Sequence, residues 1–146
     1  MSNQNVDPAV KAVGLFRNGL YCSEAILQTY NEHLNLGLNE TALRMASGFS
    51  AGLGAAKCTC GSLTGAVLVL GALKGRVNNG ESEKEVFELT KELHDRFKEK
   101  FKTTCCRVLT RDVEWGTPEH HEFCTRFVFG AVEILETVLK FKDSKR

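Results

Sequence analysis

The sequence predicts an all-α protein: a single-domain bundle of about five to six helices around a central, apolar, glycine-rich helix. The segment from Cys58 to Ala72 is the most apolar run, and its large side chains fall on every side of a helical wheel, which is typical of a buried helix. Residues 86–101 carry apolar side chains at spacings of three and four, the pattern of an amphipathic helix. A length of 146 residues with 42% hydrophobic and 25% charged residues fits one globular domain, residues 1–146.

Helix-start signals mark the first part of the chain. Asp7 and Pro8 are typical of a helix start, because aspartate caps backbone N–H groups and proline suits the first helical position. A second helix is expected from about Cys22 to His33. It places Cys22 in a first turn, where the helix dipole favours a thiolate. Asn39 is expected to cap a third, short helix.

Small residues surround the start of the central helix. The stretch from Gly48 to Lys57 forms a small-residue loop of a kind that lets backbone approach a ligand closely. It matches neither of the common nucleotide-binding glycine patterns, so phosphate binding is not expected. Gly61 and Gly65 lie four residues apart on one helix face, and each costs about 1 kcal/mol relative to alanine. We therefore expect tight packing against this face, with a thiol at the helix start as the candidate neighbour.

Two further helices are expected after the central one. Ser82 and Glu85 match a capping box for the amphipathic helix. The pair Thr117-Pro118 repeats the N-cap and proline signal and begins the final helix, whose inner face includes Cys124. The adjacent histidines His120–His121 fall in its first turn, where we expect them to be exposed or to cap the helix. A helix N-terminus disfavours imidazolium, so either could also serve as a neutral ligand.

Charge and apolarity exclude several classes of function. A net charge of +1 gives no reason to expect a nucleic-acid partner. The apolar run of residues 63–73 is shorter than the roughly 18–20 residues that span a bilayer, so membrane insertion is not expected. The first residues lack the basic and apolar segments of a secretory signal, which predicts a cytoplasmic protein. The apolar faces outnumber what a small bundle needs, which favours a homodimer.

The cysteine content points to chemistry. Six cysteines in a chain without a secretory signal indicate metal binding or thiol chemistry more often than a disulfide framework. No Cys-x-x-Cys pair is present, which excludes a thioredoxin-type site, a zinc ribbon and covalent haem attachment. The chemistry must therefore come from cysteines that are distant in the sequence and that folding brings together. The six are Cys22, Cys58, Cys60, Cys105, Cys106 and Cys124.

The order of these cysteines forms a pattern along nearly the whole chain, from about residue 19 to 139. Its elements are a cysteine at a helix start, Cys60-Gly-Ser-Leu-Thr-Gly65, Cys106-Arg-Val-Leu109, and a cysteine on the last helix. This pattern resembles the C_GCAxxG_C_C family of redox-active proteins. The resemblance implies that the family's four cysteines are Cys22, Cys60, Cys106 and Cys124. The chain departs from the family by carrying Ser62 in place of the usual alanine and two extra cysteines, Cys58 and Cys105.

The first chemistry that the resemblance implies is thiol–disulfide exchange or electron transfer with an unidentified redox partner. Cys22 and Cys60 are each expected at a helix N-terminus, which lowers a thiol pKa, so either is the expected attacking thiol. Cys106 follows a helix C-terminus and Cys124 has apolar surroundings. Both settings favour the neutral thiol and the resolving role.

The second chemistry is a Cys₄ metal site that holds zinc or an iron–sulfur cluster on the same four cysteines, with Cys58 and Cys105 as additional candidate ligands. Gly61 and Gly65 would then make room for the cofactor. The remaining alternative is a structural helical domain whose reduced cysteines pack inside the core. The sequence names neither the substrate nor the cysteine connectivity.

Overall fold

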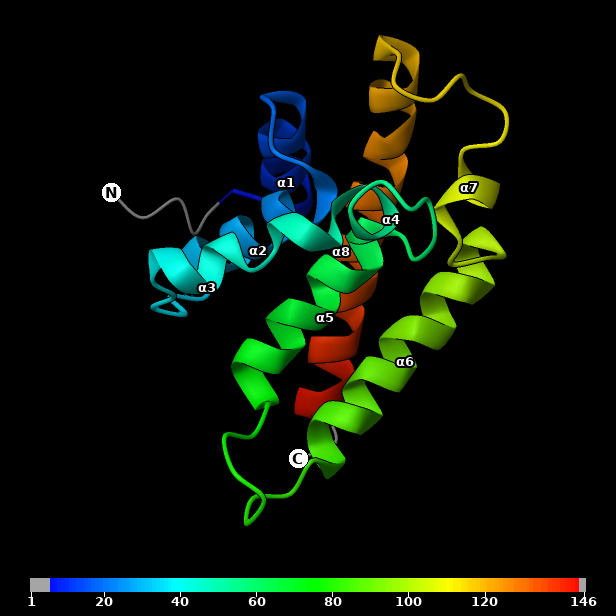
Figure 1. The fold of residues 1–146 in the computed structure, drawn as a ribbon. Helices are drawn as coiled ribbons and strands as arrows, with labels where there is room; N and C mark the ends of the chain where they lie inside the picture. Colours follow the sequence, from blue (N-terminus) through cyan, green and yellow to red (C-terminus); the bar gives the residue numbers. More distant parts are fainter. Residues whose placement is uncertain (1–5, 145–146) are drawn as a thin grey trace.

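The computed structural model describes the backbone of residues 6–144 and the side chains of residues 6–140, and it confirms the all-α fold (Figure 1). Within this part of the chain five helices have ten residues or more: α1 (Pro8–Arg17), α2 (Cys22–His33), α5 (Gly61–Lys74), α6 (Lys84–Phe101) and α8 (Pro118–Ser144). Single turns connect them: α3 (Glu40–Arg44), η1 (Ser47–Phe49), α4 (Ser50–Leu53) and α7 (Cys106–Leu109). None of the described helices is long and apolar enough to cross a membrane.

The central helix α5 lies between α2 and α6, and the long helix α8 runs behind it (Figure 1). Helix α1 packs beside α8 and α2, and α6 packs beside α8. The core between these helices is apolar, which follows from the stripes that the sequence places on each helix. Its largest fully buried side chains are Ile26, Tyr30, Leu70, Leu93, Phe97 and Leu135.

The helix starts follow the expected capping chemistry at three places. The Asp7 carboxylate accepts the Ala9 backbone N–H at 2.9 Å, and the Asn39 side chain accepts that of Ala42 at 2.9 Å. The Thr117 hydroxyl accepts the N–H of His120 at 3.2 Å, which caps the start of α8. These bonds satisfy backbone donors that have no partner inside the helix.

The expected capping box at the start of α6 is wrong. The helix begins at Lys84 with Glu83 at the N-cap, and the Ser82 hydroxyl accepts the Lys84 N–H at 3.1 Å. Ser82 therefore bonds two residues ahead, as short polar side chains do in turns, instead of three.

The glycine face of α5 packs directly on the first turn of α2. A Cβ on Gly61 would overlap the Cys22 sulfur, and one on Gly65 would lie 2.9 Å from the Cα of Ser23. The close neighbour that the glycine spacing predicts is therefore the start of α2, and the thiol against it belongs to Cys22. Two helix starts that carry cysteines are thus held side by side.

Candidate functional site

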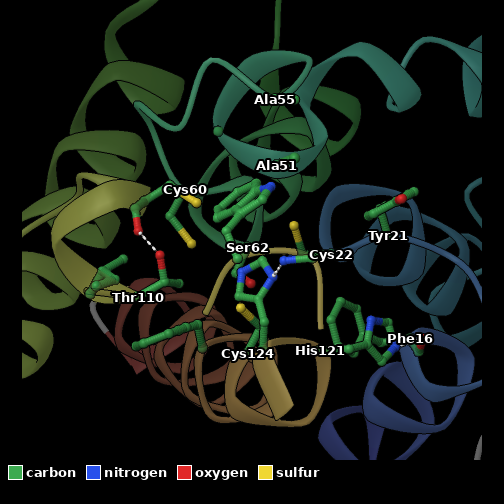
Figure 2. A pocket seen from close by; sticks show the side chains of 18 of the residues that line it. Phe16, Tyr21, Cys22, Ala51, Ala55, Cys60, Ser62, Thr110, His121 and Cys124 are labelled. Atoms are coloured by element: carbon green, nitrogen blue, oxygen red, sulfur yellow. Dashed lines mark hydrogen bonds between the residues drawn. The ribbon is translucent and has the colours of Figure 1, made fainter. Parts of the chain in front are cut away.

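Four cysteines from four elements line one cavity of about 260 Å³ beside the start of α5 (Figure 2). Cys22 begins α2, Cys60 is the N-cap of α5, Cys106 begins α7, and Cys124 lies on α8. In Figure 2 the labelled Cys22, Cys60 and Cys124 approach the same space from three sides. Cys22 and Cys124, which are 102 positions apart in the sequence, therefore line the same small cavity.

The two extra cysteines lie outside this cavity. Cys58 is exposed, and Cys105 is half-buried with its Sγ donating to the Lys57 carbonyl at 3.7 Å. They belong to an isolated antiparallel bridge between Thr59 and Cys105, in which the N–H of Cys106 donates to the Cys58 carbonyl. These backbone contacts lie next to Cys60 and Cys106. The residues Cys58 and Cys105 are not among those that line the cavity.

Hydrogen-bond donors surround the Cys22 sulfur. Backbone N–H groups of Ala51 and Ser23 and the Ser62 hydroxyl interact with it and oppose the rise in its pKa. Ser23 is itself fixed, because its hydroxyl donates to the Ala46 carbonyl at 2.8 Å and lies 2.9 Å from the Ser50 hydroxyl. A buried polar pair therefore ties α2 to the loop that covers the cavity.

That loop contains a left-handed turn that the sequence did not predict. Successive residues 51–55 have φ between +55° and +76°, and Ala51, Leu53 and Ala55 among them are not glycine. Left-handed backbone costs roughly 1–2 kcal/mol for each such residue. Strain of this kind persists only where the surroundings fix it, and it clusters at functional sites. Ala51, Gly52 and Ala55 line the cavity, so the strained turn forms part of it.

Burial governs the protonation of the four thiols. It raises the pKa of Cys22 and Cys60, and it raises that of Cys106 to about 11 and that of Cys124 to about 12. Repulsion from a Cys22 thiolate is the next cause at each of the other three. The desolvation of an ion exceeds the effect of a few N–H donors at a buried site.

The expected pKa lowering at Cys22 and Cys60 is therefore wrong. The backbone N–H groups of Ser62 and Leu63 at the start of α5 do lower the pKa of Cys60, but burial outweighs them. Cys106 follows the end of α6 at Phe101 and also begins the short helix α7, and its raised pKa confirms the expected neutral thiol. The Lys57 ammonium partly offsets the rise in its pKa.

Two histidines in the first turn of α8 lie at the cavity, and one of them, His120, also accepts a backbone N–H at the start of the helix, as the capping alternative expects. His120 and His121 both line the cavity, and neither is fully exposed. The His120 ring lies 4.2 Å from the Trp115 ring, and the Lys57 Nζ lies 4.6 Å from the Trp115 ring centre. One signal in the sequence was available: His120 precedes Cys124 by four residues, so the two share a helix face.

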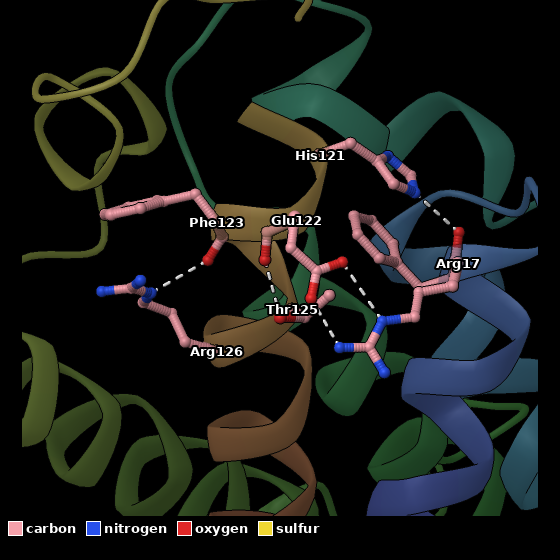
Figure 3. A network of polar contacts seen from close by, with 7 residues as sticks. Arg17, His121, Glu122, Phe123, Thr125 and Arg126 are labelled. Carbon is pink, nitrogen blue, oxygen red and sulfur yellow. Dashed lines mark hydrogen bonds and ion pairs between the residues drawn. The ribbon is translucent and has the colours of Figure 1, made fainter. Parts of the chain in front are cut away.

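A polar network fixes the first turns of α8 against α1 (Figure 3). The Arg17 guanidinium donates from Nε and Nη2 to the two carboxylate oxygens of Glu122, at 3.2 and 2.5 Å, and it holds the pKa of Glu122 below its usual range. The His121 Nε2 lies 2.9 Å from the Phe16 carbonyl, and its ring stacks on the Phe16 ring at 4.1 Å. These contacts hold the first turns of α8, the helix that carries Cys124, against α1.

The cavity does not present a site for a single metal ion. Among the described side chains, no three His, Cys, Asp or Glu residues converge on one point that would hold an ion. Zinc requires sulfur ligands at about 2.3 Å from the metal. The four cysteines line one shared cavity without three such donors meeting at a single point among the described residues.

The cavity cysteines all fall inside one recognised family region. A family model described as "Putative redox-active protein (C_GCAxxG_C_C)" matches residues 20–138, which is most of the chain. Neither the curated proteins nor the solved structures contain a match to the chain.

Proposed function

The chain belongs to the C_GCAxxG_C_C family of redox-active proteins, and we propose that the cavity lined by Cys22, Cys60, Cys106 and Cys124 is its redox centre. The observation that carries the proposal is that all four cysteines line one cavity. Chance packing of isolated core cysteines gives no reason for four of them to meet, and a strained loop gives further support.

The chemistry that we assign to this centre is thiol–disulfide exchange with a partner disulfide. One cavity thiolate attacks a sulfur of that disulfide, so a mixed disulfide forms and the first partner thiolate leaves. A second cavity thiolate then attacks the cysteine sulfur of the mixed disulfide and displaces the second partner thiolate. Two cysteines are oxidised to a disulfide, the partner disulfide is reduced to two thiols, and the two cavity protons pass to the partner.

The charges around the cavity favour Cys106 as the attacking thiol and Cys22 as the resolving thiol. The pKa of Cys106, about 11, lies below that of Cys124, about 12, and the Lys57 ammonium favours the Cys106 thiolate. Cys22 interacts electrostatically with all three of the others, so its sulfur is near enough to each to respond to its charge. This assignment reverses the roles that the sequence suggested.

The test is to oxidise the fully reduced, metal-free protein with one equivalent of a small disulfide. Two of the six thiols should be lost reversibly, and peptide mapping by mass spectrometry should place the new bond between cavity cysteines. The double variant Cys58→Ser/Cys105→Ser is the matched control and should react as the parent does. A bond that involves Cys58 or Cys105, or no bond at all, would refute the proposal.

A second candidate function is an iron–sulfur centre on the same four cysteines. Buried thiols whose anions repel one another favour a positively charged group among them, and N–H donors toward Cys22 and Cys60 are typical of cluster ligands. Such a group would supply one-electron transfer. Protein purified without oxygen would then contain iron and acid-labile sulfide in a fixed ratio and absorb visible light. Cys124→Ser should abolish both signals, whereas Cys58→Ser should leave them unchanged.

A further inference from the structure

His120 places an unpartnered hydrogen-bond donor on the wall of the cysteine cavity. The backbone N–H of Gly116 donates to His120 Nδ1 at 3.0 Å, so this nitrogen carries a lone pair. In a neutral imidazole the proton then lies on Nε2. Nε2 is buried and has no hydrogen-bond partner among the described residues. A buried donor without a partner is rare in proteins and calls for an explanation.

The surroundings hold the ring in place and keep it neutral. The ring packs on Trp115, and the His120 backbone N–H bonds to Thr117, so the first turn of α8 is fixed from two sides. Burial lowers the pKa of His120, and the charges of His121 and Lys57 lower it further. The hydrogen bond from Gly116 requires a lone pair on Nδ1, and the lowered pKa favours the neutral ring. Together they leave the single proton on Nε2.

Cys124 is the cavity cysteine that lies on the same helix as His120. The two residues are four apart on α8, where side chains are neighbours with Cβ atoms roughly 5–6 Å apart, and both line the cavity. Burial and the Cys22 and Cys106 thiolates all disfavour a negative charge on Cys124, and the Arg126 side chain is the group that lowers its pKa. Among the described residues, no hydrogen bond joins the Arg126 charge in favouring the Cys124 thiolate.

We propose that His120 is a positioning residue of the redox centre, whose Nε2–H donates a hydrogen bond to the Cys124 sulfur when that sulfur becomes an anion. The proposal rests on the proposed function for its role, because any thiol–disulfide exchange in which Cys124 takes part passes through its thiolate. The donor is present before the charge forms, so no water needs to enter the cavity to stabilise it.

Two substitutions of His120 distinguish the Nε2–H donor on the cavity wall from the hydrogen bond between Nδ1 and Gly116. His120→Asn keeps a polar oxygen near the position of Nδ1, where it accepts the Gly116 N–H, but it is too short to reach the cavity. His120→Gln places an N–H donor near the position of Nε2. The reduced full-length proteins are alkylated with iodoacetamide at one pH, and mass spectrometry follows the rate at each cysteine. Only the thiolate reacts, so the rate reports its population.

We expect His120→Asn to slow alkylation of Cys124 about tenfold, the size expected for a hydrogen bond to a charged group. His120→Gln should stay within about twofold of the parent. Cys58, which is exposed and outside the cavity, is the internal control and should react equally in all three proteins. An unchanged Cys124 rate in His120→Asn, or an equal loss in both variants, would overturn the proposal.

A folding defect in one variant does not remove the test. If His120→Asn does not fold, the Gln variant alone decides, because a tenfold loss there contradicts a role for the donor. The measurement uses reduced protein and no partner disulfide. Failure of the proposed function would appear separately, as a parent protein that forms no cavity disulfide.

Discussion

The two ends of α5 pack against their neighbours in opposite ways. Toward its C-terminal end, large side chains such as Val69 and Leu70 are fully buried in a core shared with Leu93 and Phe97 of α6. At its N-terminal end, Gly61 and Gly65 bring backbone against backbone and leave a cavity beside four sulfurs. Interlocking side chains fill space, whereas small residues let N–H donors and thiols meet around an open volume.

The largest effect is expected in the filled half. Phe97 is fully buried and its ring lies 4.8 Å from that of Phe101, so Phe97→Ala should lower the free energy of unfolding by about 3–5 kcal/mol. Urea unfolding measures this loss. The order of alkylation rates among the six cysteines in native buffer should stay as in the parent. A change in that order would mean that the two halves are not independent.

A smaller effect is expected in the glycine half, and α5 offers its own control. A Cβ on Gly61 would overlap the Cys22 sulfur and lie 3.2 Å from the Phe49 carbonyl, so Gly61→Ala should cost about 1–3 kcal/mol. Gly71 lies on the same helix with nothing within 4 Å of an added Cβ, so Gly71→Ala should stabilise by up to about 1 kcal/mol. Thermal unfolding of the two variants should show a lower midpoint temperature for Gly61→Ala and a higher one for Gly71→Ala. Equal shifts would contradict the difference between the two ends of α5.

The cavity half should also respond to alkaline pH. Burial and neighbouring thiolates raise the pKa of Cys106 from its ordinary 9.0 to about 11. Between these values the unfolded chain has lost this proton and the native protein retains it. The stabilisation that this thiol provides is therefore complete below pH 9 and is lost as the pH rises through about 11, by about 1.4 kcal/mol per pH unit.

The variant Cys106→Ser isolates this effect from the lysines and tyrosines that titrate in the same range. The free energy of unfolding of the parent should fall more steeply than that of the variant between pH 9 and 11. Parallel curves would show that the Cys106 thiol is not desolvated in the native protein.

The sequence was sufficient for the features that depend on neighbouring residues. Asp7 with Pro8 and Thr117 with Pro118 set helix starts, because a cap needs only a side chain two or three residues from a free N–H. The paired glycines of α5 indicated a close neighbour for the same reason, since their spacing fixes a helix face.

Tertiary structure alone decided the features that depend on burial and on distant segments. The direction of the pKa changes at Cys22 and Cys60 was wrong in the sequence analysis, because the desolvation of a thiolate comes from residues far along the chain. The left-handed turn around Ala51 and the place of His120 on the cavity wall likewise arise where loop and helix meet. The local sequence determines where a helix begins, whereas the pKa of a thiol depends on all the residues that surround it in the folded protein.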